Sequence, residues 1–144
     1  MENTISHYYG DWVRRLFLVS ALLSFVAIPV WGDLLQFGTF TQVSAGLLLV
    51  LLAGLTNPRT KGVMMLNSLF AAISVLLLES TAIIFRTSES WPLFIAREIS
   101  GLLMLIAFYF SVKTLRAMSL GNIGKRDAQD NLERSGQSER QTFL

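Results

Sequence analysis

The amino-acid sequence predicts an all-α integral membrane protein, an antiparallel four-helix transmembrane bundle with short loops and a disordered C-terminal tail. Only 15% of the 144 residues are charged, whereas soluble domains carry about 25%. The mean hydropathy is +0.50 even though the C-terminal segment is plainly polar, so apolar residues must be concentrated upstream. This composition excludes a water-soluble globule, and the absence of cysteine excludes a disulfide-stapled scaffold.

Four segments are apolar enough to cross a bilayer, whose core of about 30 Å requires roughly 20 helical residues. They run over about 16–32, 37–55, 62–85 and 92–112. The second is the weakest because its first two turns are polar. The connections are about four to six residues long, so consecutive helices are expected to be antiparallel neighbours.

The distribution of Lys and Arg predicts that both termini and the middle loop are cytoplasmic, an N-in/C-in topology. Basic residues precede the first span, fill the loop between the second and third, and follow the fourth. These topology determinants are Arg14, Arg15, Arg59, Lys61, Lys113 and Arg116. We therefore expect a cytoplasmic juxtamembrane segment over 1–15 and a plasma (inner) membrane location.

The region 113–144 is predicted to be a cytoplasmic tail. From about residue 122 it is rich in Gln, Ser, Arg, Asp and Glu and has no apolar period. Such a composition buries too little apolar surface to fold, so we expect this part to be disordered.

Two charged residues lie inside the predicted spans and are the main candidate site. Glu79 should lie about 10 Å from the outer end of the third span, and Arg97 about 7 Å from the same end of the fourth. Because charges in the membrane are costly, we expect them to pair. The pair is either a structural clasp or part of an ion- or proton-coupling vestibule. A third possibility is that each snorkels to the interface without a partner.

Three polar residues are secondary candidates. Glu98 follows Arg97 in sequence but points about 100° around the helix, toward a second neighbour or the headgroups. Asn67 and Gln42 are expected to make interhelical hydrogen bonds rather than to hold a ligand.

Several kinds of chemistry have no residues to support them. Without cysteine there is no thiol redox site, and without histidine in the spans there is no paired haem ligation. We therefore expect no enzyme activity, no cofactor, no metal and no nucleic-acid partner. In size the chain is similar to the small multidrug-resistance exporters. That family carries its coupling glutamate in the first span, whereas the first predicted span of this chain, 16–32, contains no acidic residue.

Two functions remain, of different classes. The first is a small multi-pass protein that acts by binding or assembly, as an accessory subunit, assembly factor or homo-oligomeric scaffold. Its partners would be the lipid bilayer and another membrane protein or a second copy. The second is a small transporter or channel that uses Glu79 and Arg97. This alternative requires a polar lumen, which normally shows rows of polar residues along the spans.

Overall fold

A computed structural model describes residues 9–35, 37–56 and 60–120, and this part of the chain is all-helical as predicted. Its helices are α1 (Gly10–Val30), α2 (Thr39–Leu55), α3 (Lys61–Phe85) and α4 (Trp91–Ser119). Among them α1, α3 and α4 are long and apolar enough to cross a membrane, which suggests a membrane protein. Helix α2 has 17 residues and is shorter. Arg59 and the predicted disordered tail lie outside the described residues.

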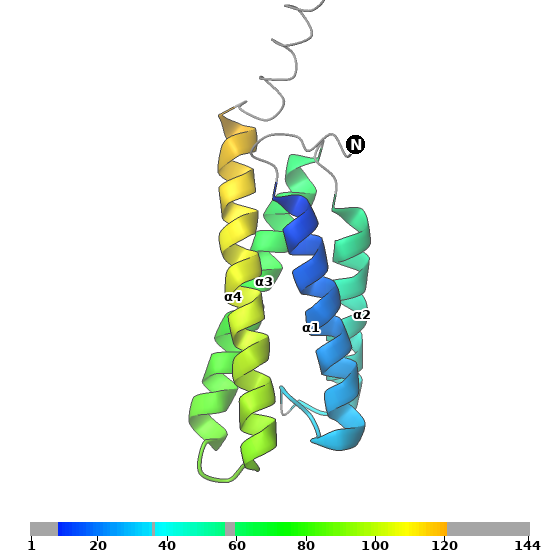
Figure 1. The fold of residues 1–144 in the computed structure, drawn as a ribbon, viewed down its shortest axis with the longest axis vertical. Helices are drawn as coiled ribbons and strands as arrows, with labels where there is room; N and C mark the ends of the chain where they lie inside the picture. Colours follow the sequence, from blue (N-terminus) through cyan, green and yellow to red (C-terminus); the bar gives the residue numbers. More distant parts are fainter. Residues whose placement is uncertain (1–8, 36, 57–59, 121–144) are drawn as a thin grey trace, which may run out of the picture.

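The helices form two pairs, α1 with α2 and α3 with α4, and the pairs are joined mainly through α1 and α4 (Figure 1). Helices α2 and α3 hardly contact each other. The α1–α2 loop and the α3–α4 turn lie at one end of the molecule, which we call the loop end. The start of α1 and the end of α4 lie at the opposite end, which we call the terminal end. The bundle is therefore closed on three sides and open between α2 and α3.

Two helices extend beyond the predicted apolar spans, both at the terminal end. Helix α1 begins at Gly10, and α4 continues to Ser119. The extra turns carry basic residues that flank the spans. Continuing the helix through them lets their backbone N–H and C=O groups hydrogen-bond within the segment. The N–H of Tyr9 donates to Thr114 Oγ1 at 3.2 Å, and the Tyr9 ring stacks on Phe110 with centroids 5.5 Å apart. These contacts join the start of α1 to the end of α4.

Helix α1 ends at the loop end with a proline and a glycine. Pro29 lies in its last turn and has no backbone N–H to donate. The carbonyl of Ala27 accepts from both Trp31 N (2.8 Å) and Gly32 N (2.9 Å), and Gly32 has φ +99°. A left-handed residue at this position is the usual way to end a helix and turn the chain. The loop then crosses back toward the centre of the bundle.

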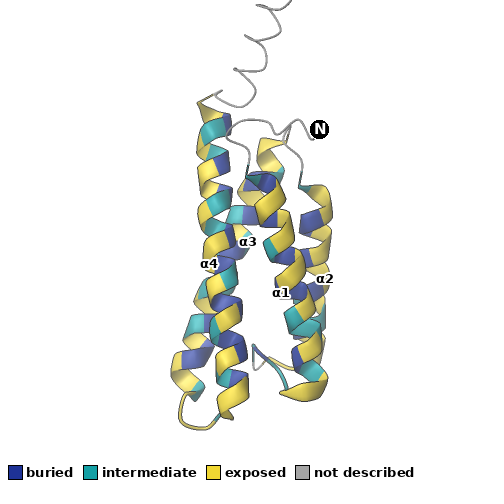
Figure 2. Ribbon diagram, in the orientation of Figure 1, coloured by how far each residue is buried: buried dark blue, intermediate teal, exposed yellow. Residues whose placement is uncertain are grey.

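Buried residues lie on the sides of the helices that face one another, while the outward sides are exposed (Figure 2). Small residues dominate the buried side of α4, at Ala96, Ser100, Gly101, Ala107 and Ser111. Small side chains let helix backbones approach closely. Close packing of this kind drives helix association in a bilayer, where the hydrophobic effect does not. This face of α4 explains why α4 contacts both α1 and α3.

Two glycines of α2 provide a matched test of this packing. A Cβ at position 46 would lie 2.8 Å from the Phe25 ring of α1, whereas a Cβ at position 54 would meet nothing within 4 Å. We expect Gly46→Ala to lower the free energy of unfolding by about 1–3 kcal/mol, because an overpacked contact forces a shift. Gly54→Ala should raise it by up to about 1 kcal/mol through helix propensity. Thermal unfolding in detergent measures both, and equal effects of the two variants would contradict the α1–α2 packing.

Candidate functional site

The most polar feature inside the bundle is built around Arg97 of α4, which is fully buried. Its Nε donates to the carbonyl of Leu34, in the α1–α2 loop, at 2.6 Å. Its Nη1 forms a salt bridge with the carboxylate of Glu89, whose side chain is also buried. A buried guanidinium therefore joins the start of α4 to a loop that is 63 residues away in sequence.

The same loop residue continues the network to the other helix pair. The N–H of Leu34 donates to Gln42 Oε1 at 2.6 Å, and Gln42 Nε2 donates to the carbonyl of Ser24 at 2.8 Å. We call Glu89, Arg97, Leu34, Gln42 and Ser24 the Arg97 network. It connects α4, the loop, α2 and α1 at the loop end, and most of its members are buried. The predicted role of Gln42, an interhelical hydrogen bond, is the role it has here.

The partner of Arg97 differs from the one that we predicted. Arg97 pairs with Glu89, and no salt bridge joins it to Glu79 within the described residues. Glu79 lies instead against Gly101, where an added Cβ would come within 2.8 Å of its Oε1. Gly101 is four residues beyond Arg97, about 6 Å deeper along α4. The prediction counted the depth of each charged residue from the end of its own helix. It therefore did not include the offset along the bundle between α3 and α4.

Glu89 is a residue of the site that the sequence did not predict. It immediately precedes Ser90, the N-cap residue of α4, and lies eight residues before Arg97. Side chains of a helix point toward its N-terminus, so the long side chain of Arg97 can extend back along the first turns of α4 to reach Glu89. A carboxylate at a helix N-terminus is also favoured by the helix dipole.

The other two charged candidates share a second location. Glu79 and Glu98 both line a cavity of about 310 Å³ on the α3–α4 side, together with Ile99, Gly101 and Leu102. Both glutamates are partly exposed. Glu98 thus faces away from the Arg97 network and toward the same cavity as Glu79.

Asn67 lies near the terminal end and is fully buried. Its Nδ2 donates to Thr56 Oγ1 at 2.9 Å, just beyond the end of α2, and Thr56 Oγ1 donates to the carbonyl of Leu52 at 2.8 Å. Asn67 Oδ1 has no hydrogen-bond partner in the described residues. The residue thus joins α3 to the end of α2.

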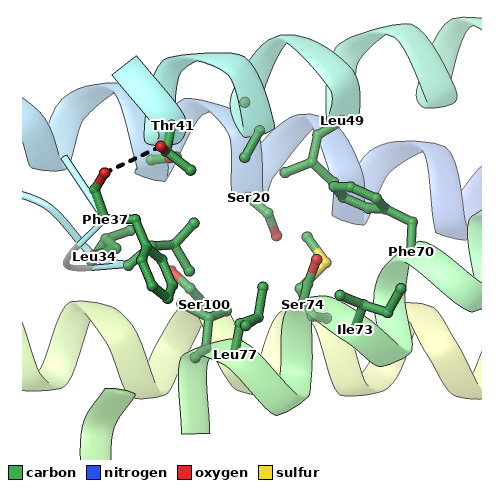
Figure 3. Close-up of a pocket in the computed structure, with 16 residues that line it drawn as sticks. Ser20, Leu34, Phe37, Thr41, Leu49, Phe70, Ile73, Ser74, Leu77 and Ser100 are labelled. Carbon is green, nitrogen blue, oxygen red and sulfur yellow. Dashed lines mark hydrogen bonds between the residues drawn. The ribbon is translucent and has the colours of Figure 1, made fainter. Parts of the chain in front are cut away.

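A cavity of about 160 Å³ lies between the two helix pairs, and sequence reasoning did not predict it (Figure 3). We call it the α2–α3 cavity. Its walls are mostly apolar, but hydroxyls reach it from several helices. They belong to Ser20, Ser24, Thr41, Ser74 and Ser100. Within the described part of the chain, no group of three or more acidic, histidine or cysteine side chains could hold a metal ion.

Comparison with models of known protein families, with curated proteins and with solved structures finds no match for this chain.

A mutant cycle tests the Arg97 network. Arg97→Met removes the buried cation that faces the Glu89 carboxylate and should lower the free energy of unfolding by about 3–5 kcal/mol. The double variant Arg97→Met/Glu89→Gln should recover much of that loss, because no buried charge then lacks its counterion. Thermal unfolding in detergent provides the measurement.

Glu79→Gln is the matched control for this cycle. Its effect should add to that of Arg97→Met, since the two side chains share no contact in the structure. Recovery in the Arg97→Met/Glu79→Gln variant, and none with Glu89→Gln, would mean that Arg97 pairs with Glu79, as predicted from the sequence, and not with Glu89.

Proposed function

We propose that the chain is a four-span, antiparallel integral membrane protein of the plasma membrane, with both termini in the cytoplasm, and that it acts by binding or assembly. In this proposal it is an accessory subunit, assembly factor or homo-oligomeric scaffold, it has no catalytic activity, and its partners are the bilayer and another membrane protein or a second copy. In this proposal α2 also crosses the membrane, although it is shorter than the other three helices.

The positions of the basic residues support this orientation. Those that are described lie at or near the terminal end and are exposed, namely Arg14, Arg15, Lys61, Lys113 and Arg116. The loop end carries the acids Asp33 and Glu89 and one exposed cation, Arg86. An excess of Lys and Arg at one end is the pattern of a cytoplasmic side.

The observation that carries the binding proposal is that Arg97 is bonded to other groups inside the bundle. Its Nε and Nη1 are both engaged within the bundle, one by a backbone carbonyl and one by Glu89. A cation held in this way fixes the loop end and does not line a conduction path. What the bundle leaves open is the side between α2 and α3, where large apolar side chains are exposed and no helix covers them.

A small transporter or channel is the second candidate, and one observation favours it. Glu79 and Glu98 line the same cavity of about 310 Å³, and ionisable residues at membrane depth often mark ion or proton pathways. In this alternative Glu79 is the coupling residue without Arg97 as its counterion. The other residues that line this cavity are apolar, which is why we place this function second.

Reporter fusions test the topology. Fusions at Gly10, Lys61 and Leu144 should all report a cytoplasmic location, and a fusion at Glu89 should report an external one, because the Lys and Arg excess sets orientation. A cytoplasmic report at Glu89, or an external one at Leu144, would contradict four spans and require that α2 does not cross the membrane.

Site-specific cross-linking tests the open side, and the chain contains no cysteine to interfere. Leu48 lies three residues after Ala45, and Leu66 seven residues before Ile73, so each shares a helix face with a residue that lines the α2–α3 cavity. A benzophenone attached at Leu48→Cys or Leu66→Cys should give a discrete higher-mass adduct on illumination in native membranes.

The controls are Leu22→Cys on α1 and Leu102→Cys on α4, which are more exposed than Leu48 and Leu66 but lie on other sides (64% and 57%, against 39% and 50%). They should give lipid adducts alone. Protein adducts from the control positions, with none from α2 and α3, would contradict binding through the open side.

A further inference from the structure

The α2–α3 cavity occupies the half of the bundle nearer the loop end. Leu34 and Phe37 of the loop lie at one end of it, and Leu49 and Phe70 lie at the other (Figure 3). Phe70 packs edge-on against Phe17 of α1, with ring centroids 6.4 Å apart. The cavity is therefore shut toward the terminal end by aromatic packing and toward the loop end by the segment that Arg97 holds in place.

Exposure shows where the cavity opens. The lining residues Phe37, Ile73 and Leu77 are 62%, 46% and 38% exposed, whereas Ser20 and Met104 are buried. The exposed members come from the loop just before α2 and from α3, and α2 and α3 hardly contact each other. The opening thus faces sideways between α2 and α3, toward the position of lipid in the proposed topology.

The polar groups of the cavity indicate what it holds. Ser20 of α1 is 3% exposed, and its Oγ has no hydrogen-bond partner in the described residues. Ser20 and Ser74 point their hydroxyls into the cavity from opposite helix pairs (Figure 3). Ser100, by contrast, donates to the carbonyl of Ala96 at 2.8 Å and is satisfied within its own helix.

An unpartnered buried hydroxyl is unfavourable, and an apolar filling would leave it so. An oxygen atom placed between Ser20 and Ser74 would accept from one or both hydroxyls while the rest of the molecule contacts the apolar walls. The volume of about 160 Å³ is close to that of an engineered cavity of about 150 Å³ that stays dry and binds benzene. The space therefore fits one ring or a comparable part of a larger molecule.

We propose that the α2–α3 cavity is a binding site for a neutral, lipid-soluble molecule that carries a hydroxyl or carbonyl oxygen on a ring or short apolar skeleton. The molecule enters from the bilayer between α2 and α3, and its oxygen hydrogen-bonds to Ser20 and Ser74. The cavity opens on the same side through which the proposed partner would bind, but purified protein alone suffices to test it, so the two proposals can fail separately.

The test compares two probes of nearly the same shape, p-cresol and p-xylene, which differ by a hydroxyl in place of a methyl group. A ligand that binds the folded state raises its melting temperature with concentration, in proportion to RT ln(1 + [L]/Kd). Unfolding of the full chain in detergent is followed by circular dichroism at increasing concentrations of each probe. We expect p-cresol to raise the melting temperature and p-xylene to do so less, with about a three- to tenfold weaker Kd for the loss of one hydrogen bond.

Variants assign the effect to the cavity. Ser20→Ala and Ser74→Ala should each bring the Kd of p-cresol close to that of p-xylene, whereas Ser68→Ala, on α3 but not lining the cavity, should leave it unchanged. Ala45→Leu fills the space and should abolish the effect of both probes. The two serine variants lie on different helix pairs, so misfolding of one leaves the other as a test.

Three results would overturn the proposal. Equal affinity for the two probes would mean that the cavity takes apolar chains, such as lipid tails, without using its hydroxyls. No response to either probe would mean that it holds water only. A p-cresol response that survives both Ala45→Leu and Ser20→Ala would place the binding elsewhere on the protein.

Discussion

Burial of the Arg97 guanidinium is the constraint on which the rest of the fold depends. Removing a guanidinium from water costs several kcal/mol unless its donors find acceptors inside the bundle. The nearest carboxylate supplies one acceptor, through Glu89, and the loop must supply the other, through the carbonyl of Leu34. The loop therefore has to cross the loop end of the bundle rather than extend away from it. Arg97 Nη2 still has no partner among the described residues, so this solution is incomplete.

Once the loop is held there, its own backbone has to be satisfied. The N–H of Leu34 is buried with its residue, and Gln42 is the side chain that accepts from it. This explains the glutamine one turn inside α2, whose amide is engaged through both its oxygen and its nitrogen. At the terminal end, Tyr9 and Thr114 hold α1 to α4. Both ends thus reinforce the contact between α1 and α4. Helix α3 is joined to the end of α2 at the terminal end, through the hydrogen bond from Asn67 to Thr56, and the two helices hardly contact each other along the rest of their length.

The sequence was sufficient to predict the all-helical fold and which residues are unusual within it. Apolar length, proline and glycine positions and the flanking charges are local signals, and they placed the helices to within a few residues except where α1 and α4 extend past their apolar cores. Asn67 and Gln42 were recognisable because an amide in an apolar helix needs a partner from another element. These inferences require no knowledge of how the helices are offset.

The pairing of Arg97 did require that knowledge. Glu79 and Glu89 are both acids near the loop end, and only the vertical offset that sets Glu79 opposite Gly101 decides between them. The α2–α3 cavity was hidden for a similar reason. A serine in an apolar helix usually bonds to its own backbone, as Ser100 does. Nothing local to Ser20 distinguishes it from Ser100, because its lack of a partner follows from the separation of two helices.

The shortness of α2 bears on the membrane around the protein. Its 17 residues give a length of about 26 Å, less than the roughly 30 Å of an average hydrocarbon core. In the proposed four-span topology, this hydrophobic mismatch would fall on one side only, because α1, α3 and α4 are long enough. Lipids beside α2 must then compress or yield to shorter-chain neighbours, at a fraction of a kcal/mol per ångström. The protein would be sorted toward thinner membranes, and the thinned annulus would coincide with the mouth of the α2–α3 cavity.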